Sequence, residues 1–117
     1  MGFKFEKLEV WDLALEYSDL TYTIANQLPH SEEYNLKSQL IRAATSIALN
    51  IAEGSTSQSD AEFSRFLGMA IRSLVETVAC LRLIERRKYA ESDSLQEISA
   101  AGEKLFAKLQ ALRKTLR

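Results

Sequence analysis

The sequence has little that would interrupt a helix, with one proline and four glycines in 117 residues. So few helix breakers favour long, continuous helices. Its single cysteine, Cys80, cannot form an intramolecular disulfide, which argues against a disulfide-stabilised secreted scaffold. No apolar run approaches the roughly 18 residues needed to cross a membrane, and residues 1–12 lack the apolar core of a signal peptide. We therefore expect a cytoplasmic protein.

The chain is long enough for one domain with a buried core, spanning residues 1–117. A hydrophobic fraction of 46% with 26% charged residues is ordinary for a globular protein. The net charge of −1 conceals an asymmetry. Residues 1–58 hold four Lys or Arg against eight Asp or Glu, and residues 59–117 hold eleven against eight. Such a chain can pair with copies of itself or present a basic end to an acidic partner, but solvated helix faces explain the same pattern.

Apolar residues recur at spacings of three and four in four segments. These predict helices over about residues 8–28, 31–53, 59–88 and from residue 94 to near the C-terminus. Pro29 ends the first helix, and Gly54 is expected to cap the second in a left-handed conformation. The third and fourth begin at the capping boxes Ser59 to Glu62 and Ser94 to Glu97. No stretch alternates with period two for long enough to form a strand. The prediction is an all-α, antiparallel up-down-up-down four-helix bundle.

The second helix is unusual because residues 38–52 contain a single charge, at Arg42. Besides its core face, its flank is also small or apolar, where an isolated bundle would show charged side chains to water. A narrow polar stripe remains, and we predict that it lies at a contact with another subunit. This stripe consists of Gln39, Arg42, Ser46, Asn50 and Glu53. The alternative is an exposed face whose small residues tolerate water.

Two basic clusters are candidates for binding RNA. The first is Arg82, Arg86, Arg87 and Lys88, and the second is Arg113, Lys114 and Arg117. A pI near 5.9 gives poor support, because neutralising phosphates requires excess positive charge. Cations in the last turn of a helix also suit its dipole without any ligand. In an antiparallel bundle the two clusters lie at opposite ends.

No catalytic, metal-binding or cofactor-binding residues are predicted. His30 is the only histidine and follows Pro29 in an exposed loop. Cys80 is interpreted as a small packed side chain. Glu53 and Glu76 are interpreted as structural acids rather than a catalytic pair, and Arg72 and Glu76 are one turn apart and within reach of each other. The segment GSTSQS has neither the lysine nor the spacing of a phosphate-binding loop.

Several segments resemble the bacterial family of 23S ribosomal RNA intervening-sequence proteins. The most specific is QLIRAATSIALNIAEG, residues 39–54. Others are Leu8 to Trp11 with Ala14, Leu28-Pro29, residues 62–67 and Ser73 to Glu76, so that the similarity spans essentially the whole chain. Two positions depart from the family pattern, which commonly has proline where Ala48 stands and glycine where Arg72 stands. Ala48 should straighten the helix, and Arg72 should loosen a close approach.

The resemblance implies a four-helix bundle that assembles into a homopentameric ring. It also implies kinship with accessory proteins of diversity-generating retroelements, which bind nucleic acid and a reverse transcriptase. We therefore expect a homo-oligomer that binds RNA or a nucleic-acid-binding protein. The alternative is a protein-binding adaptor without a nucleic-acid role. Its binding surface would be the acidic face formed by Glu9, Asp12, Glu16 and Asp19.

Overall fold

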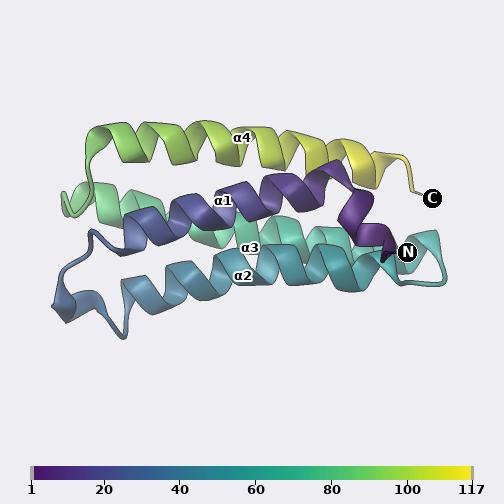
Figure 1. The fold of residues 1–117 in the computed structure, drawn as a ribbon, viewed down its shortest axis with the longest axis horizontal. Helices are drawn as coiled ribbons and strands as arrows, with labels where there is room; N and C mark the ends of the chain where they lie inside the picture. The colour runs from purple at the N-terminus through teal and green to yellow at the C-terminus, as the bar shows by residue number, and fades with distance from the viewer. Residues whose placement is uncertain (1, 117) are drawn as a thin grey trace.

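The computed structural model describes residues 2–116 and contains, within them, four α-helices and no strand. The helices are α1 (Glu9–Ala25), α2 (Leu36–Ser55), α3 (Asp60–Arg86) and α4 (Ser92–Lys114). Two short 3₁₀ helices, η1 (Lys4–Lys7) and η2 (His30–Glu32), precede α1 and α2. Figure 1 shows that successive helices run in opposite directions along the long axis. The predicted all-α four-helix fold is confirmed.

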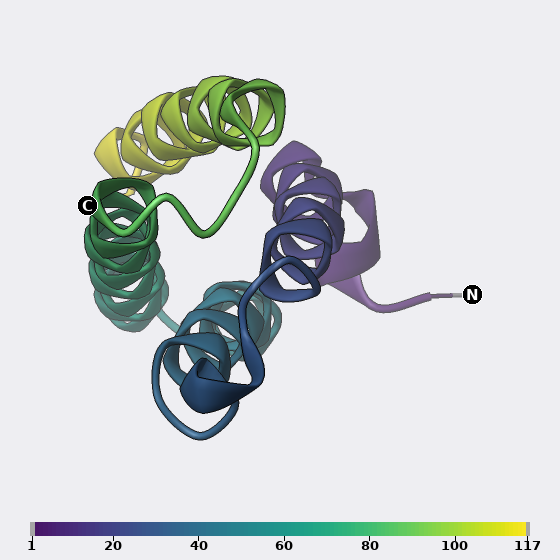
Figure 2. The same cartoon turned by 90° about the vertical axis from the view of Figure 1, so that its left-hand side faces the viewer.

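The helices pack in ring order, each against its neighbours in the sequence, and α4 closes the ring against α1. Viewed along the bundle, they occupy the four corners of a square (Figure 2). The molecule measures 43 × 25 × 24 Å. The pair α2 and α3 packs most extensively, whereas α3 and α4 pack least closely of the adjacent pairs. One side of the bundle is therefore more open than the others.

The helical spacing of Val10, Leu13, Tyr17, Leu20 and Ile24 predicts that they form the buried face of α1, and Val10, Tyr17 and Ile24 are buried. Leu13 and Leu20 are only half-buried, while Ala14 and Thr21 face the core with at most 1% of their surface exposed. Tyr17, between them in the sequence, is a large aromatic residue that is also only 1% exposed. Small residues beside a large aromatic allow this dense packing. Periodicity ranks residues by hydrophobicity, so it favoured the leucines.

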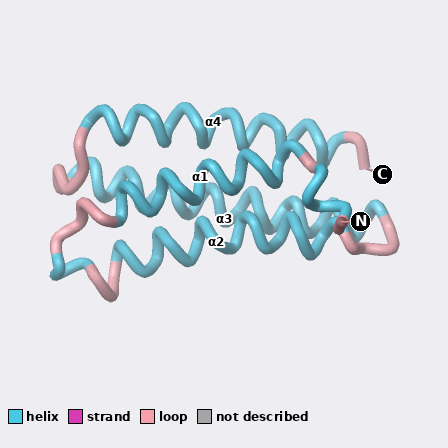
Figure 3. The backbone as a smooth tube through the Cα atoms, viewed as in Figure 1, coloured by secondary structure: helices cyan, strands magenta, loops and turns pink. Residues whose placement is uncertain are grey.

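The connection between α1 and α2 is longer than predicted, because α1 ends at Ala25 and α2 starts at Leu36. After α1, the amides of Gln27 and Leu28 bond to carbonyls three residues back, which tightens the chain before Pro29. The Gln27 side chain then accepts a hydrogen bond from the Glu91 amide at 2.8 Å. The α-helix therefore ends three residues before the predicted boundary, and the connection to α2 is irregular except for η2 (Figure 3).

Ser59 caps α3 as predicted, its hydroxyl accepting from the Glu62 amide at 3.1 Å. The other two predicted helix ends are wrong. Ser94 does not cap α4, because this helix begins at Ser92 with Glu91 as the N-cap residue. The hydroxyl of Ser94 instead accepts a hydrogen bond from the Gln27 side chain. Gly54 lies inside α2 without a positive φ, and among residues 2–116 the left-handed conformation is found at Lys88.

Gly54 is required by packing rather than by backbone conformation. A Cβ at this position would lie 2.6 Å from the Cβ of Phe66 and 3.0 Å from the ring of Phe63. The end of α2 therefore approaches the start of α3 more closely than any residue with a side chain would permit. This close approach lets the two helices pack along their length.

Candidate functional site

The predicted basic clusters occupy opposite ends of the bundle, because α3 and α4 are antiparallel (Figure 1). Arg82, Arg86, Arg87 and Lys88 are all exposed in or just after the last turns of α3. Arg113 and Lys114 are exposed at the end of α4. The predicted contributor Arg117 lies outside the described residues. The structure therefore does not merge the two clusters within one chain.

A longer basic surface appears once the exposed face of α3 is followed along its length. Arg65, Arg72, Arg82 and Arg86 are all exposed and fall within an arc of about 100° of the helix. We call these four residues the arginine stripe. From Arg65 to Arg86 it spans about 31 Å at 1.5 Å per residue. Sequence reasoning included Arg82 and Arg86 but missed Arg65, and treated Arg72 only as a departure and a possible partner of Glu76. The signal that could have identified Arg65 and Arg72 is their position on the same polar face of the helix as Arg82 and Arg86.

None of these arginines forms an ion pair with a residue of the described chain. Within residues 2–116 the ion pairs are Lys37 with Glu33 at 3.2 Å and Lys108 with Glu9 at 3.4 Å. The pairing of Arg72 with Glu76, suggested by their spacing, does not form. The charge of the arginine stripe is therefore not neutralised by direct contacts.

Arg65 is held in place by neutral neighbours. Its guanidinium lies over the Phe66 ring, 4.8 Å from the centroid, and Nη1 lies 3.5 Å from the sulfur of Met69. A cation over an aromatic face keeps its charge and its outward hydrogen-bond donors. Exposed apolar side chains, Met69, Val75 and Leu83, are interspersed with the arginines. Arginine with methionine and aliphatic groups is a composition found in binding surfaces.

Side-chain hydrogen bonds hold together the loops at the end of the bundle where α3 terminates. Tyr89 donates from its hydroxyl to Glu32 at 3.2 Å, which joins the α3–α4 loop to η2. The pKa of the Glu32 carboxyl is lowered chiefly by a hydrogen bond from Asn35, with smaller effects from Tyr89 and the charge of Arg87. Arg87 and Lys88 thus belong to an ordered connection.

The polar stripe predicted for α2 divides into two parts. Asn50 is only 9% exposed and donates to the Ser46 carbonyl at 2.9 Å and to its hydroxyl at 3.0 Å. The Ser73 hydroxyl of α3 donates to the Ser46 hydroxyl at 2.9 Å. Ser46 therefore joins α2 to α3 within one subunit, and Asn50 bonds to Ser46 within α2. Gln39, Arg42 and Glu53 are exposed.

The outward side of α2 also presents apolar surface. Leu49 is 55% exposed, and Thr45 is exposed beside it. Ile41 and Ala52 are half-buried on the same side, whereas Ala48 is buried. We refer to Ile41, Thr45, Leu49 and Ala52 as the α2 apolar face. These residues, with Gln39, Arg42 and Glu53, make up the surface predicted to contact another subunit.

The residues considered for chemistry lie apart from one another. His30 is exposed at the start of η2, as predicted. Cys80 is buried, as predicted, and its thiol pKa is raised by burial and by the nearby charge of Glu76. A raised pKa disfavours the thiolate that a nucleophile requires. Among residues 2–116 no three His, Cys, Asp or Glu side chains gather as a metal site would require.

The acidic face proposed for an adaptor is present on α1. Glu9, Asp12, Glu16 and Asp19 are all exposed, and Glu9 pairs with Lys108 of α4. Within the described chain, no helix combines the length and apolar character needed to span a membrane.

Comparison with known proteins agrees with the architecture. The chain resembles a protein of unknown function from the S23 ribosomal protein family of Bacteroides thetaiotaomicron, with a TM-score of 0.82 and 27% sequence identity. The similarity covers 90% of this chain and 98% of that one. No curated protein matches the chain. The model of the 23S rRNA-intervening sequence protein family matches residues 6–111. The chain therefore belongs to the 23S rRNA-intervening sequence protein family.

Proposed function

We propose that this protein is a non-catalytic, self-associating bundle that binds structured RNA through the arginine stripe. The observation that carries the proposal is four exposed arginines on one face of α3 without an ion pair in the described chain. Membership of a family named for an intervening sequence in 23S rRNA agrees with an RNA ligand.

The geometry of the stripe suits a phosphate backbone. Arginine presents a planar fork of donors that binds phosphate oxygens bidentately. A row about 31 Å long on a straight helix can contact successive phosphates along a duplex or a folded loop. Such contacts recognise backbone position rather than base identity, and RNA duplexes are recognised largely by shape. The ligand expected is therefore structured RNA with little sequence preference.

Self-association increases the effect of a modest charge. The net charge of one chain is only −1, so a single stripe should bind RNA weakly. Several copies held together bind one RNA with an affinity greater than that of each stripe alone. The α2 apolar face is the surface that we assign to this contact, because Leu49 and Thr45 are exposed where a solvated helix would carry charge.

Fluorescence anisotropy with a labelled RNA hairpin tests the RNA proposal. We compare the triple variant Arg72→Gln, Arg82→Gln, Arg86→Gln with a charge-matched control, Lys7→Gln, Lys104→Gln, Lys108→Gln. The stripe variant should bind at least about tenfold more weakly. The slope of the logarithm of its binding constant against the logarithm of the salt concentration should become shallower by about one for each lost phosphate contact. Equal losses in both variants, or an affinity that does not change with salt, would refute a specific stripe.

The adaptor hypothesis predicts a different pattern. The exposed acids Asp12, Glu16 and Asp19 provide a surface for a basic protein partner. If this is the function, the protein should show no affinity for RNA at low salt and should co-purify with protein rather than with nuclease-sensitive absorbance. Changing these three acids to their amides should then abolish capture of the partner, while the stripe variant should retain it.

A further inference from the structure

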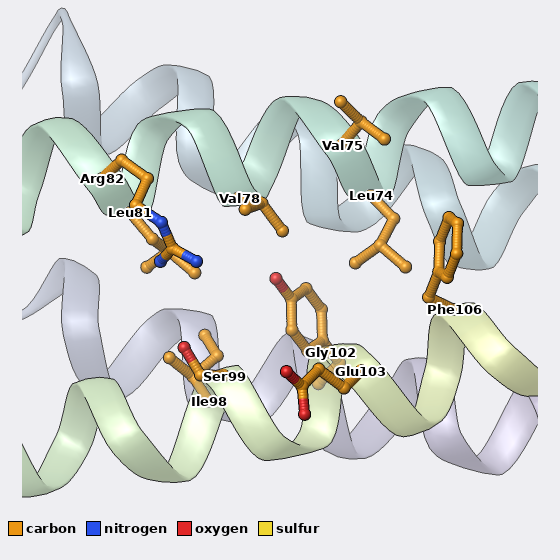
Figure 4. Close-up of a pocket in the computed structure, with 11 residues that line it drawn as sticks. Leu74, Val75, Val78, Leu81, Arg82, Ile98, Ser99, Gly102, Glu103 and Phe106 are labelled. Carbon is orange, nitrogen blue, oxygen red and sulfur yellow. The ribbon is translucent and has the colours of Figure 1, made fainter.

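The open side of the bundle contains a groove of about 270 Å³ between α3 and α4. Its walls are mainly apolar, and Figure 4 shows side chains from both helices directed into the space between them. The principal apolar lining residues are Leu74, Val78, Leu81, Ile98 and Phe106. A volume just below the usual range of drug-sized pockets suits a smaller ligand.

The floor of the groove is formed by Tyr17 of α1, which is only 1% exposed. Its hydroxyl lies 2.7 Å from Thr77 Oγ1, and that threonine donates its hydrogen to the Leu74 carbonyl at 2.6 Å. Because Thr77 has no second hydrogen, the Tyr17 hydroxyl must donate to it. The floor is therefore fixed, with an aromatic ring as its base.

Gly102 of α4 lets the helix backbone approach the ring of Tyr17 at the edge of the groove. A Cβ at this position would lie 3.1 Å from Tyr17 Cε1, which is closer than most side chains pack. The glycine therefore lets the tyrosine ring lie directly beneath the backbone of α4. Both Tyr17 and Gly102 line the groove. The site depends on this close approach of α1 and α4.

Two opposite charges border the apolar space. Arg82 reaches from α3 toward the space between the helices, and Glu103 lies on α4 beside Gly102 (Figure 4); both residues line the groove. Both residues are exposed, and neither forms an ion pair with a residue in 2–116. A groove with one cation and one anion on facing walls is complementary to a ligand that carries both charges.

We propose that this groove binds a free α-amino acid with an apolar side chain. The carboxylate accepts hydrogen bonds from Arg82, the ammonium donates to Glu103, and the side chain enters the apolar space above Tyr17. Each charge-assisted contact adds orientation as well as affinity, while burial of the apolar side chain supplies the non-directional part. This site shares Arg82 with the arginine stripe, and its test measures amino-acid binding in the absence of RNA.

NMR titration of the ¹⁵N-labelled protein with L-phenylalanine tests the site. Two analogues remove one charge each: 3-phenylpropionate lacks the ammonium, and 2-phenylethylamine lacks the carboxylate. Phenylalanine should give saturable changes in the amide chemical shifts of residues in α3 and α4. Each analogue should bind at least about tenfold more weakly than phenylalanine. Absence of saturable shifts with phenylalanine would overturn the proposal. So would equal binding of all three compounds, which would indicate apolar partitioning alone.

Variants assign the two charges. Arg82→Gln should weaken phenylalanine binding about tenfold but leave 2-phenylethylamine unchanged, and Glu103→Gln should leave 3-phenylpropionate unchanged. Lys104→Gln is the control, because Lys104 is exposed on α4 and does not line the groove. All three positions are exposed, so the fold should persist, which circular dichroism checks. If Glu103→Gln leaves the affinity for phenylalanine unchanged, the proposal that the groove recognises both charges of an amino acid is wrong. That result would leave the RNA-binding proposal standing.

Discussion

Gly54 and Gly68 both lie within helices, but their surroundings differ. A Cβ on Gly54 would meet the Phe66 Cβ, which is fixed to the α3 backbone. A Cβ on Gly68 would lie 2.9 Å from Nη2 of Arg113, the end of a flexible side chain. The first neighbour can move only if the helices separate, whereas the second can rotate away.

Alanine substitution should therefore act in opposite directions at these two glycines. We expect Gly54→Ala to lower the free energy of unfolding by about 1–3 kcal/mol through overpacking. Gly68→Ala should leave it unchanged or raise it by up to about 1 kcal/mol, because alanine favours the helix. Urea unfolding of both variants measures the difference. A stabilised Gly54→Ala protein would show that the α2–α3 contact is looser than described.

Tyr17 makes stability sensitive to alkaline pH. Burial raises the pKa of its hydroxyl above 10.0, outweighing the lowering effects of the Thr77 hydrogen bond and the Arg82 charge. A group whose pKa is higher in the folded state contributes stability that is complete below its unfolded pKa and is lost as pH rises through the folded one. The wild-type protein should therefore lose stability above pH 10.0.

Tyr17→Phe isolates this effect. At neutral pH the variant should be about 1 kcal/mol less stable, because Thr77 loses its hydrogen-bond donor. Above pH 10.0 the difference from wild type should shrink, since phenylalanine has no proton to lose. Denaturant unfolding at both pH values checks this, and a constant difference would rule out titration of Tyr17. The Cys80 thiol, whose pKa is also raised, is present in both proteins, and its charge further raises the pKa of Tyr17 in the wild type.

At the scale of elements, the start of α3 depends on one side chain. Ser59 accepts the Glu62 amide, while no side chain caps α4. Ser59→Ala should lower the free energy of unfolding by about 1 kcal/mol. Ser92→Ala is the matched control, because Ser92 is exposed at the first residue of α4 and makes no side-chain hydrogen bond in the described chain. Thermal unfolding compares the two, and equal effects would show that the cap contributes nothing particular.

The ends of elements were predicted less well than their centres. The capping hydroxyl of Ser59 identified the start of α3, because that interaction lies within three residues of sequence. Ser94 carries the same local pattern, but its hydroxyl accepts from Gln27, a residue 67 positions away. Gln27 also accepts a hydrogen bond from the amide of Glu91, the N-cap residue of α4. Contacts between distant loops are not visible in local patterns.

At the scale of the whole molecule, the α2 apolar face leads to a prediction about assembly. Leu49→Asp should dissociate the proposed assembly, because a charge in a desolvated contact is costly. The fold should persist, since the leucine side chain is 55% exposed. Leu15→Asp is the matched control, because Leu15 is 41% exposed on α1. Size-exclusion chromatography with light scattering at micromolar concentration gives the mass of each.

The control separates assembly from general surface effects. Leu15→Asp should retain the mass of the wild-type assembly, and the wild type should exceed the mass of one chain. A monomeric wild-type protein would refute self-association through α2. Identical masses for the wild type and Leu49→Asp would instead place the contact elsewhere.

By itself, the sequence determined the four helices and their approximate extents, because the periodic spacing of apolar residues encodes them directly. Its local motifs likewise identified the family to which the chain belongs. It also indicated the exposed positions of His30 and the basic residues at the end of α3. The tertiary structure alone decided that Ser46, held by Asn50, bonds to Ser73 across the contact of α2 with α3, and that Gly54 is needed for a close approach. It also decided that Arg82 and Glu103 face one groove. Those features depend on which helix faces meet, and that is set by packing among all four helices together.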